Sequence, residues 1–128
     1  MLLVSKKAGD QYRLQQVRGN MSLYAKYIAE RGGKFIVEEE HGFATFSYLQ
    51  DGIYIEDIYI EKDYRKLGNA SSMADKIALI AKDQDYKYLY GTVCPEAKGS
   101  TESMKVLLAY GFQLHGSIQN LVWFRKEI

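Results

Sequence analysis

Apolar residues near the start of the chain recur with the period of a helix. Over Asp10–Arg31 they fall three or four positions apart, at Leu14, Val17, Met21, Tyr24 and Ile28. This spacing predicts one helix with a single buried stripe. Asp10 is the expected N-cap, and Gly32 with Gly33 supplies the stop. Gly19 lies inside the stripe and marks where such a helix would break.

The period then changes to that of strands. Alternating apolar and polar residues predict three strands, at Lys34–Glu39, Phe43–Gln50 and Ile53–Ile60. His41-Gly42 and Asp51-Gly52 are turn-forming pairs between them. We therefore expect three consecutive antiparallel strands after the first helix.

Two adjacent carboxylates stand in the middle of the third predicted strand. Glu56 and Asp57 separate two apolar halves, Ile53–Ile55 and Ile58–Ile60, and disturb the alternation of inward-facing and outward-facing residues. Such a local conflict is typical of functional or strained sites. A β-bulge at this point would relieve it.

The rest of the chain alternates helix and strand. A helix from Gly68 or Ala70 to Asp83 carries small apolar residues on one face, which lets a helix lie close to a sheet. The elements expected after it are a strand, a second helix and a hairpin, at Tyr88–Cys94, Ser100–Tyr110, Phe112–Ser117 and Leu121–Glu127. This order predicts an α+β fold (mixed α/β, three layers), with helices flanking a mostly antiparallel sheet.

The composition is that of an ordinary globular domain. The chain has 128 residues, of which 47% are hydrophobic and 26% charged, so we expect one domain over residues 1–128. No apolar run is long enough for a membrane span, and the apolar start is too short for a secretory signal. The single Cys94 excludes an intrachain disulfide and, with two His, indicates no metal cluster. A cytoplasmic location is expected.

Acidic residues cluster in this sequence, whereas basic residues are scattered. The formal net charge is only +1, and no nucleic-acid partner is expected. One short segment contains Asp51, Glu56, Asp57, Glu61 and Asp63. This clustering indicates a cationic partner, with a solvated acidic face as the alternative explanation.

A basic, glycine-containing turn leads from the third strand into the next helix. Unpaired N–H groups and the positive dipole end at a helix N-terminus favour phosphate. Gly68 permits close approach of a ligand to the backbone, and Arg65 and Lys66 add positive charge. The alternative is a plain strand–turn–helix connection, because one glycine is a weak signal.

This turn resembles the cofactor loop of the GNAT superfamily of N-acetyltransferases. The sequence Arg65-x-x-Gly68-x-Ala70 matches the family pattern Arg/Gln-x-x-Gly-x-Gly/Ala. The preceding Ile55–Ile60 looks like the fourth strand of that family. The local sequence of this strand is most similar to that of the diamine and polyamine acetyltransferase branch.

The wider chain is similar to the same family in the order of its elements. The Tyr88–Cys94 strand, the Ser100–Tyr110 helix and the Gly111-Phe112 ending follow the loop as they do in that family. The resemblance is strongest over Ile53–Phe112 and is only topological before it. The resemblance implies a GNAT-like fold.

The resemblance also implies acetyl-CoA as cofactor. The backbone of Ile58, Tyr59 and Ile60 would pair with the pantetheine arm as an added strand. The turn would hold the diphosphate through the backbone N–H groups of Lys66, Leu67, Gly68, Asn69, Ala70 and Ser71, with Arg65 as a positive charge beside it. The helix start at Ser100 and Ser103 would lie beside the pantetheine and thioester, although family members often have Asn in place of Ser100.

The activity that the resemblance implies is direct acetyl transfer to a primary amine. Such an amine is largely protonated near neutral pH, and Glu56 stands where the family often carries a base, with Asp57 as second candidate. Many relatives place a Tyr acid for the departing thiolate where this chain has Leu107. Tyr110, one turn along the same helix, is the candidate substitute, with packing as its alternative role.

Alternative hypotheses remain open at this stage. The acceptor would be a small cationic amine or a protein lysine. Leu107 in place of Tyr supports a catalytically weak acyl-CoA-binding or regulatory module. The high Tyr content, 11 residues, supports a protein-interaction domain that recognises its target through a Tyr-rich surface. Relatives are often dimers, and a homodimer through Leu121–Phe124 as an exposed edge is considered.

Overall fold

The structure is a computed structural model that describes residues 22–128. Its elements, in chain order, are α2 (Leu23–Gly32), β1 (Phe35–Glu39), β2 (Gly42–Tyr48), β3 (Gly52–Ile60), a 3₁₀ turn (Lys62–Tyr64), α3 (Asn69–Asp83), β4 (Tyr88–Val93), α4 (Ser100–Tyr110), β5 (Gln113–Ile118) and β6 (Leu121–Glu127). The predicted strands and the two predicted later helices are confirmed. The α4 helix has the expected bounds because Gly111 ends it in a left-handed conformation, with φ of 110°.

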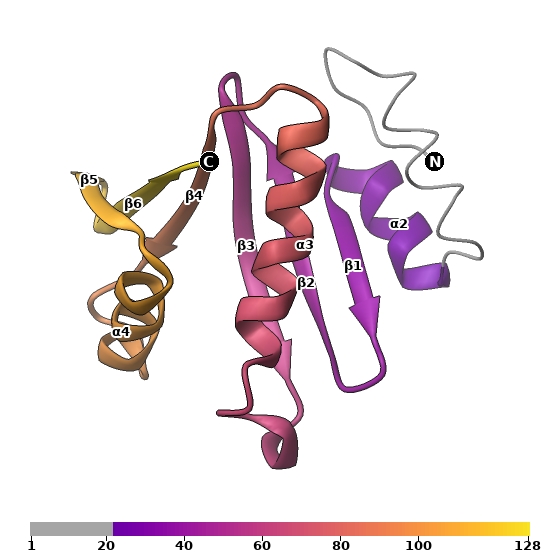
Figure 1. The fold of residues 1–128 in the computed structure, drawn as a ribbon, viewed down its shortest axis with the longest axis horizontal. Coiled ribbons are helices and arrows are strands. Elements are labelled where there is room, and N and C mark those ends of the chain that lie inside the picture. Colours follow the sequence, from indigo (N-terminus) through magenta and orange to yellow (C-terminus); the bar gives the residue numbers. More distant parts are fainter. Residues whose placement is uncertain (1–21) are drawn as a thin grey trace.

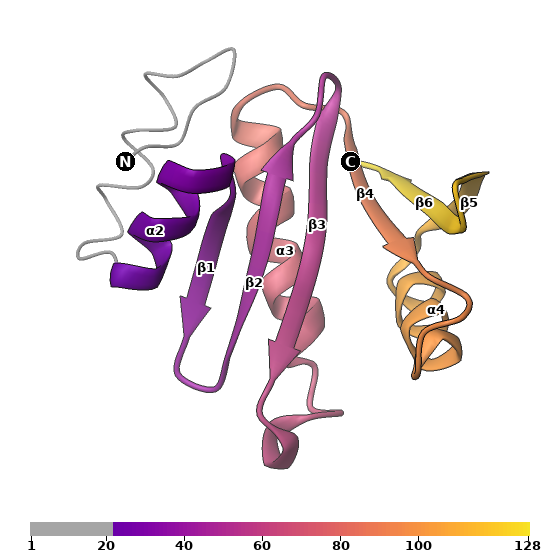
Figure 2. The same ribbon diagram turned by 180° about the vertical axis from the view of Figure 1, so that it is seen from behind.

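The strands form one sheet in the order β1-β2-β3-β4-β6-β5. Every neighbouring pair is antiparallel except β3 and β4, which run parallel. Figures 1 and 2 show α3 lying along β1, β2 and β3 on one face of this sheet. The predicted α+β architecture with a mostly antiparallel sheet is therefore confirmed.

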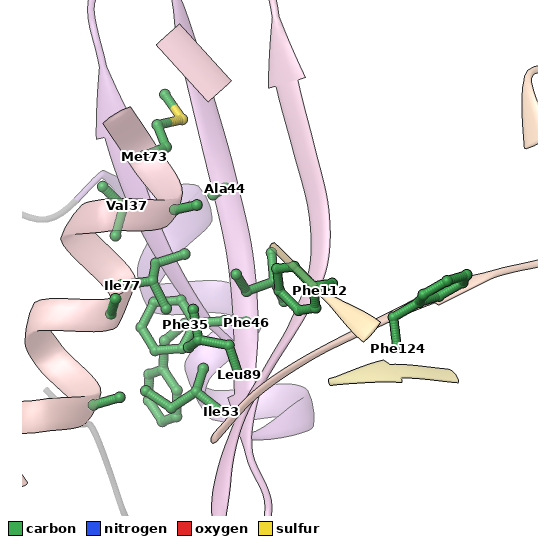
Figure 3. Packing of buried hydrophobic residues seen from close by; sticks show 14 of the residues in the cluster. Phe35, Val37, Ala44, Phe46, Ile53, Met73, Ile77, Leu89, Phe112 and Phe124 are labelled. Carbon is green, nitrogen blue, oxygen red and sulfur yellow. The ribbon is translucent and has the colours of Figure 1, made fainter. Parts of the chain in front are cut away.

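The main core lies between α3 and the sheet. Because apolar residues recur at helical spacing, one face of α3 buries Met73, Ala74, Ile77, Ala78 and Ala81. Figure 3 shows Ile77 above the aromatic and aliphatic side chains that the strands send to this face, among them Phe35, Phe46 and Leu89. The tight contact between α3 and the sheet fixes the turn that precedes α3 relative to the end of β3.

Helix α2 covers the opposite face of the sheet. Its buried Ala25 and Ile28 pack against Ile36 of β1. The helix predicted over Asp10–Arg31 does not run through Ser22, which lies close to the break expected at Gly19. Ser22 has extended backbone angles and accepts a hydrogen bond from the Ala25 N–H, which caps a helix that begins at Leu23. The expected N-cap Asp10 lies outside the described residues.

A β-bulge interrupts β3 at the predicted position. Thr45 of β2 lies opposite Asp57, and the next residue, Phe46, lies opposite Ile55. Glu56 is thus the extra residue of β3, without a partner on β2. A bulge of this kind bends its strand and turns a side chain in a new direction.

Strands β3 and β4 separate next to this bulge. Their parallel pairing covers only Gly52–Tyr54 of β3, and in Figures 1 and 2 the two strands diverge from there. The Tyr54 hydroxyl and the Thr92 hydroxyl lie 2.7 Å apart and connect the strands where they begin to diverge. Past Tyr54, the backbone groups of β3 that point toward β4 have no strand partner.

The order of the last two strands corrects the expected dimer edge. Leu121–Phe124 belongs to β6, which lies between β4 and β5. Its backbone is paired on both sides, with Val93 to Gly91 of β4 and with Ile118 to Leu114 of β5. The exposed edge at this end of the sheet is therefore β5.

We expect Gly52→Ala to destabilise the fold by about 3 kcal/mol or more, at the upper end of overpacking effects. A Cβ at Gly52 would lie 2.3 Å from the backbone oxygen of Tyr88, so the short parallel pairing of β3 with β4 would have to open. Urea unfolding measures the loss. The matched control is Gly116→Ala in β5, where a Cβ meets nothing within 4 Å; equal losses in both variants would contradict this account.

Candidate functional site

The turn before α3 has the backbone of an anion-binding loop. Lys66 and Gly68 both have positive φ, 62° and 86°, and they alternate with residues of ordinary φ. Such alternation turns successive N–H groups toward one concavity. Gly68 is the N-cap of α3 and offers no side-chain cap, so the helix N-terminus stays open to a ligand.

The backbone N–H groups of this turn have no acceptor among the described residues. Outside regular elements, the hydrogen bonds near the turn run from Arg65 N–H to the Lys62 oxygen and from Ser72 N–H to the Gly68 oxygen. The amides of residues 66–71 donate to none of the described groups. These donors and the positive end of α3 fit a diphosphate.

Two side chains of the turn hold it in place. The Arg65 Nε donates to the Ile60 backbone oxygen at 2.8 Å, and the side-chain Nδ2 of Asn69 donates to the Tyr64 backbone oxygen at 2.8 Å. The Arg65 guanidinium also lies 5.7 Å from the Tyr59 ring centre. Arg65 therefore ties the turn to the end of β3, while Lys66 and Leu67 are exposed.

The predicted pantetheine strand lies at the separation of β3 and β4. Ile58, Tyr59 and Ile60 follow the bulge, on the part of β3 that does not pair with β4. The backbone groups here that point away from β2 have no strand partner within residues 22–128, and among them the Ile60 oxygen accepts from Arg65 Nε. An extended chain could pair there as a strand does.

Glu56 and Asp57 line a pocket on the α2 face of the sheet. The pocket has a volume of about 330 Å³, and its walls include Tyr24 of α2, Phe43 of β2 and Tyr59 of β3. Acidic and aromatic groups together suit a cationic ligand. The bulge brings these two neighbouring carboxylates into one pocket.

The Glu56 carboxylate is held by two contacts. Ser47 Oγ donates to Oε1 at 3.3 Å, and Lys34 Nζ lies 2.9 Å from Oε2. The side chain of Glu56 is only 18% exposed, against 49% for Lys34. The hydrogen bond and charge of Glu56 raise the pKa of the Lys34 ammonium. Asp57 is more exposed and accepts from the Thr45 hydroxyl at 3.4 Å.

The start of α4 offers fewer free donors than the start of α3. The Ser100 N–H donates to the Ala97 oxygen at 3.2 Å, and its hydroxyl donates to the Pro95 oxygen at 3.1 Å. Ser103 is exposed, and its N–H donates to the Gly99 oxygen. The predicted role of these two serines beside the thioester stays a prediction.

Tyr110 connects the two helices on the α3 face. Its hydroxyl donates to Asp75 Oδ1 of α3 at 2.5 Å. Burial and this carboxylate raise the pKa of Tyr110, which keeps the hydroxyl protonated. Leu107, where the sequence resemblance predicts the family's acid, packs against Gly91 and the main core.

We expect Tyr110→Phe to lower the free energy of unfolding by about 1 kcal/mol, because one hydrogen bond is lost. Its effect on kcat should stay below about threefold, since the hydroxyl is already engaged by Asp75. Urea unfolding and steady-state kinetics give the two values. A kcat loss of about 10²-fold, the lower range for a general acid, would instead assign the thiolate proton to Tyr110.

Reasoning from the sequence missed Lys34 and Tyr24 as members of this site. Lys34 was the first residue of a predicted strand, and Tyr24 was one position of an apolar stripe. The only signal was the acidic pair itself, because a half-buried carboxylate in a globular protein normally has a partner.

Residues 22–128 show neither a metal-binding cluster nor a membrane-spanning helix. This part of the chain holds no group of three or more His, Cys, Asp or Glu placed to bind a metal ion. No helix in it is both long enough and apolar enough to cross a bilayer. His41 lies in the β1–β2 turn, stacked on Tyr64 and beside Glu61.

Solved structures share this fold. The PaiA N-acetyltransferase of Thermoplasma acidophilum, in complex with coenzyme A, is similar with a TM-score of 0.66 at 11% identity, over 98% of this chain and 81% of its own. A GNAT family acetyltransferase of Elizabethkingia anophelis with acetyl-CoA bound gives 0.61 at 14%, over 86% and 93%. A GNAT-family protein of Desulfovibrio desulfuricans gives 0.66 at 10%, over 98% and 94%.

Sequence comparison gives the family. A search of curated proteins finds no match. The family model described as Acetyltransferase (GNAT) family matches residues 6–112, which includes the bulged strand, the turn with its free amides and both later helices. The chain therefore belongs to the GNAT family of acetyltransferases, whose acyl donor is acetyl-CoA.

Proposed function

We propose that this chain transfers an acetyl group from acetyl-CoA directly to a primary amine, with Glu56 as general base. The observation that carries the proposal is the position of the Glu56 bulge. It lies where β3 leaves β4, so an acyl donor between the strands and an amine in the pocket would meet beside this carboxylate. No covalent intermediate on the protein is required.

In this proposal, acetyl-CoA supplies the activated thioester, and the chain supplies binding and proton transfer. The free amides of residues 66–71 bind the diphosphate, and the backbone of Ile58–Ile60 aligns the pantetheine arm. Glu56 removes the proton of the acceptor ammonium, directly or through a water. A backbone N–H at the bulge would donate to the developing oxyanion.

The acceptor class follows from the pocket. Asp57 has no cationic partner within ion-pair distance among residues 22–128, and three aromatic rings lie in the same walls. These features favour a cationic amine, either a small polyamine-like molecule or a protein lysine. A diamine would place its second ammonium at Asp57, in agreement with the branch that the sequence resembles.

A second candidate is an acyl-CoA-binding module with weak catalysis. It is favoured by Leu107, which cannot donate a proton, and by the engagement of Tyr110 with Asp75. A thiolate is a tolerable leaving group and can take its proton from water. Turnover therefore separates the two candidates.

Two measurements test the proposed function. Acetyl-CoA should raise the melting temperature, because a ligand that binds only the folded state stabilises it. Thiol release should then occur with at least one member of a panel of monoamines, diamines and lysine peptides. A thermal shift without thiol release would favour the binding module, and the absence of both would contradict the proposal.

A further inference from the structure

We propose that Lys34 is a built-in acceptor, acetylated on Nζ by the site that contains Glu56. This inference rests on the proposed function. If Glu56 deprotonates the acceptor directly, the acceptor nitrogen must come within hydrogen-bond distance of its carboxylate. The Lys34 Nζ already lies 2.9 Å from Glu56 Oε2 and lines the same pocket. The chain therefore carries its own primary amine at the position that an acceptor amine must reach.

The route of the Lys34 side chain supports this assignment. Lys34 follows the end of α2, where Gly33 turns the backbone with φ of 65°. Its methylene groups pass close to Gly32, at 3.7 to 3.9 Å from the position of a Cβ there. The side chain is 49% exposed, so it retains freedom to move within the pocket while its amine stays near Glu56.

The charges of the pocket give this ion pair a consequence for other acceptors. Glu56 and Asp57 are two carboxylates, and Lys34 neutralises one of them. An incoming ammonium must displace Lys34 from Glu56 to be deprotonated. External amines and Lys34 should therefore compete for one position.

The reaction balances without a further reactant. The Lys34 ammonium gives one proton to Glu56, and the neutral nitrogen forms a C–N bond with the acetyl carbon. The thioester C–S bond breaks with its electron pair on sulfur, the nitrogen loses its second proton, and the sulfur takes that proton. Glu56 then returns the first proton to water. The products are acetyl-lysine at position 34 and free coenzyme A.

The test is intact mass and peptide mapping of the protein after incubation with acetyl-CoA alone. We expect one acetyl group on Lys34 before any on Lys66, which lies in the diphosphate turn, or on the exposed Lys26 of α2. The half-time should not change when the protein is diluted, because the step is intramolecular. Added amine acceptor should slow it, and Glu56→Gln should slow it at Lys34 only.

Controls separate this inference from general lysine reactivity and from the proposed function. Acetic anhydride without acetyl-CoA should label Lys34 no faster than Lys26, because the ion pair with Glu56 keeps the Lys34 nitrogen protonated. Lys34→Arg keeps a positive charge and should remove the modification. If amines are turned over while Lys34 stays unmodified, or Lys66 is modified equally fast, the inference is wrong and the function stands. If acetyl-CoA neither stabilises the protein nor acetylates any amine, both are wrong.

Discussion

Glu56→Gln should lower kcat by about 10²–10⁴-fold, the range for loss of a general base. Glutamine keeps the size of the side chain and can still accept from Ser47 Oγ, which contacts Glu56 at 3.3 Å. It cannot take a proton from the acceptor ammonium. The stabilisation by acetyl-CoA should be unchanged, because the turn at residues 66–71 is not altered. Steady-state kinetics at several pH values give kcat, and the thermal shift gives the stabilisation by acetyl-CoA.

The matched control for this prediction is the neighbouring carboxylate. Asp57→Asn removes a negative charge from the same pocket but leaves the bulged Glu56 in place. We expect it to raise KM for a cationic acceptor and to lower kcat by less than about tenfold, since it does not remove the base. Unchanged kcat in Glu56→Gln at every pH, or a larger kcat loss in Asp57→Asn, would show that the base is assigned wrongly.

Gly68→Asp should weaken acetyl-CoA binding by at least about 10²-fold. A Cβ at Gly68 points into open space, and a carboxylate there would stand beside the diphosphate. Placing like charges together costs several kcal/mol, and about 1.4 kcal/mol corresponds to a tenfold change in Kd. Isothermal titration calorimetry with acetyl-CoA measures the change.

Gly68→Asn is the control that isolates charge from backbone strain. Gly68 has φ of 86°, and Asn and Asp both tolerate the left-handed region better than other residues. The two variants therefore share shape and strain and differ in charge. We expect Asn to bind acetyl-CoA at least about tenfold more tightly than Asp. Equal affinities of the two variants for acetyl-CoA would show that the diphosphate does not bind at this turn.

Local signals in the sequence were sufficient for most of the fold. Gly111 predicted the end of α4, and Gly33 the end of α2, because a left-handed residue there satisfies the last helical carbonyls. The adjacent carboxylates Glu56 and Asp57 predicted the bulge, because a paired core strand could not hold both. The family resemblance added what periodicity could not, namely the chemistry of the turn.

Contacts between distant parts of the chain were beyond a sequence pattern. Gly19 marked a possible break, but the apolar stripe before Gly32 did not show that Ser22 would be the N-cap of α2, because an N-cap hydrogen bond leaves no trace in periodicity. The hairpin of β5 and β6 was predicted, but which strand joins β4 depends on packing. The Lys34–Glu56 ion pair joins residues whose proximity arises only when β1 and β3 lie in one sheet.

The proposed activity requires that backbone amides of residues 66–71 bind the diphosphate of acetyl-CoA. A crystal structure of the protein with coenzyme A would show whether they do. We predict diphosphate oxygens within hydrogen-bond distance of the N–H groups between Gly68 and Ser71, with the pantetheine arm along Ile58–Ile60. A bound coenzyme A whose diphosphate lies elsewhere, with these amides facing solvent or protein atoms, would contradict the account.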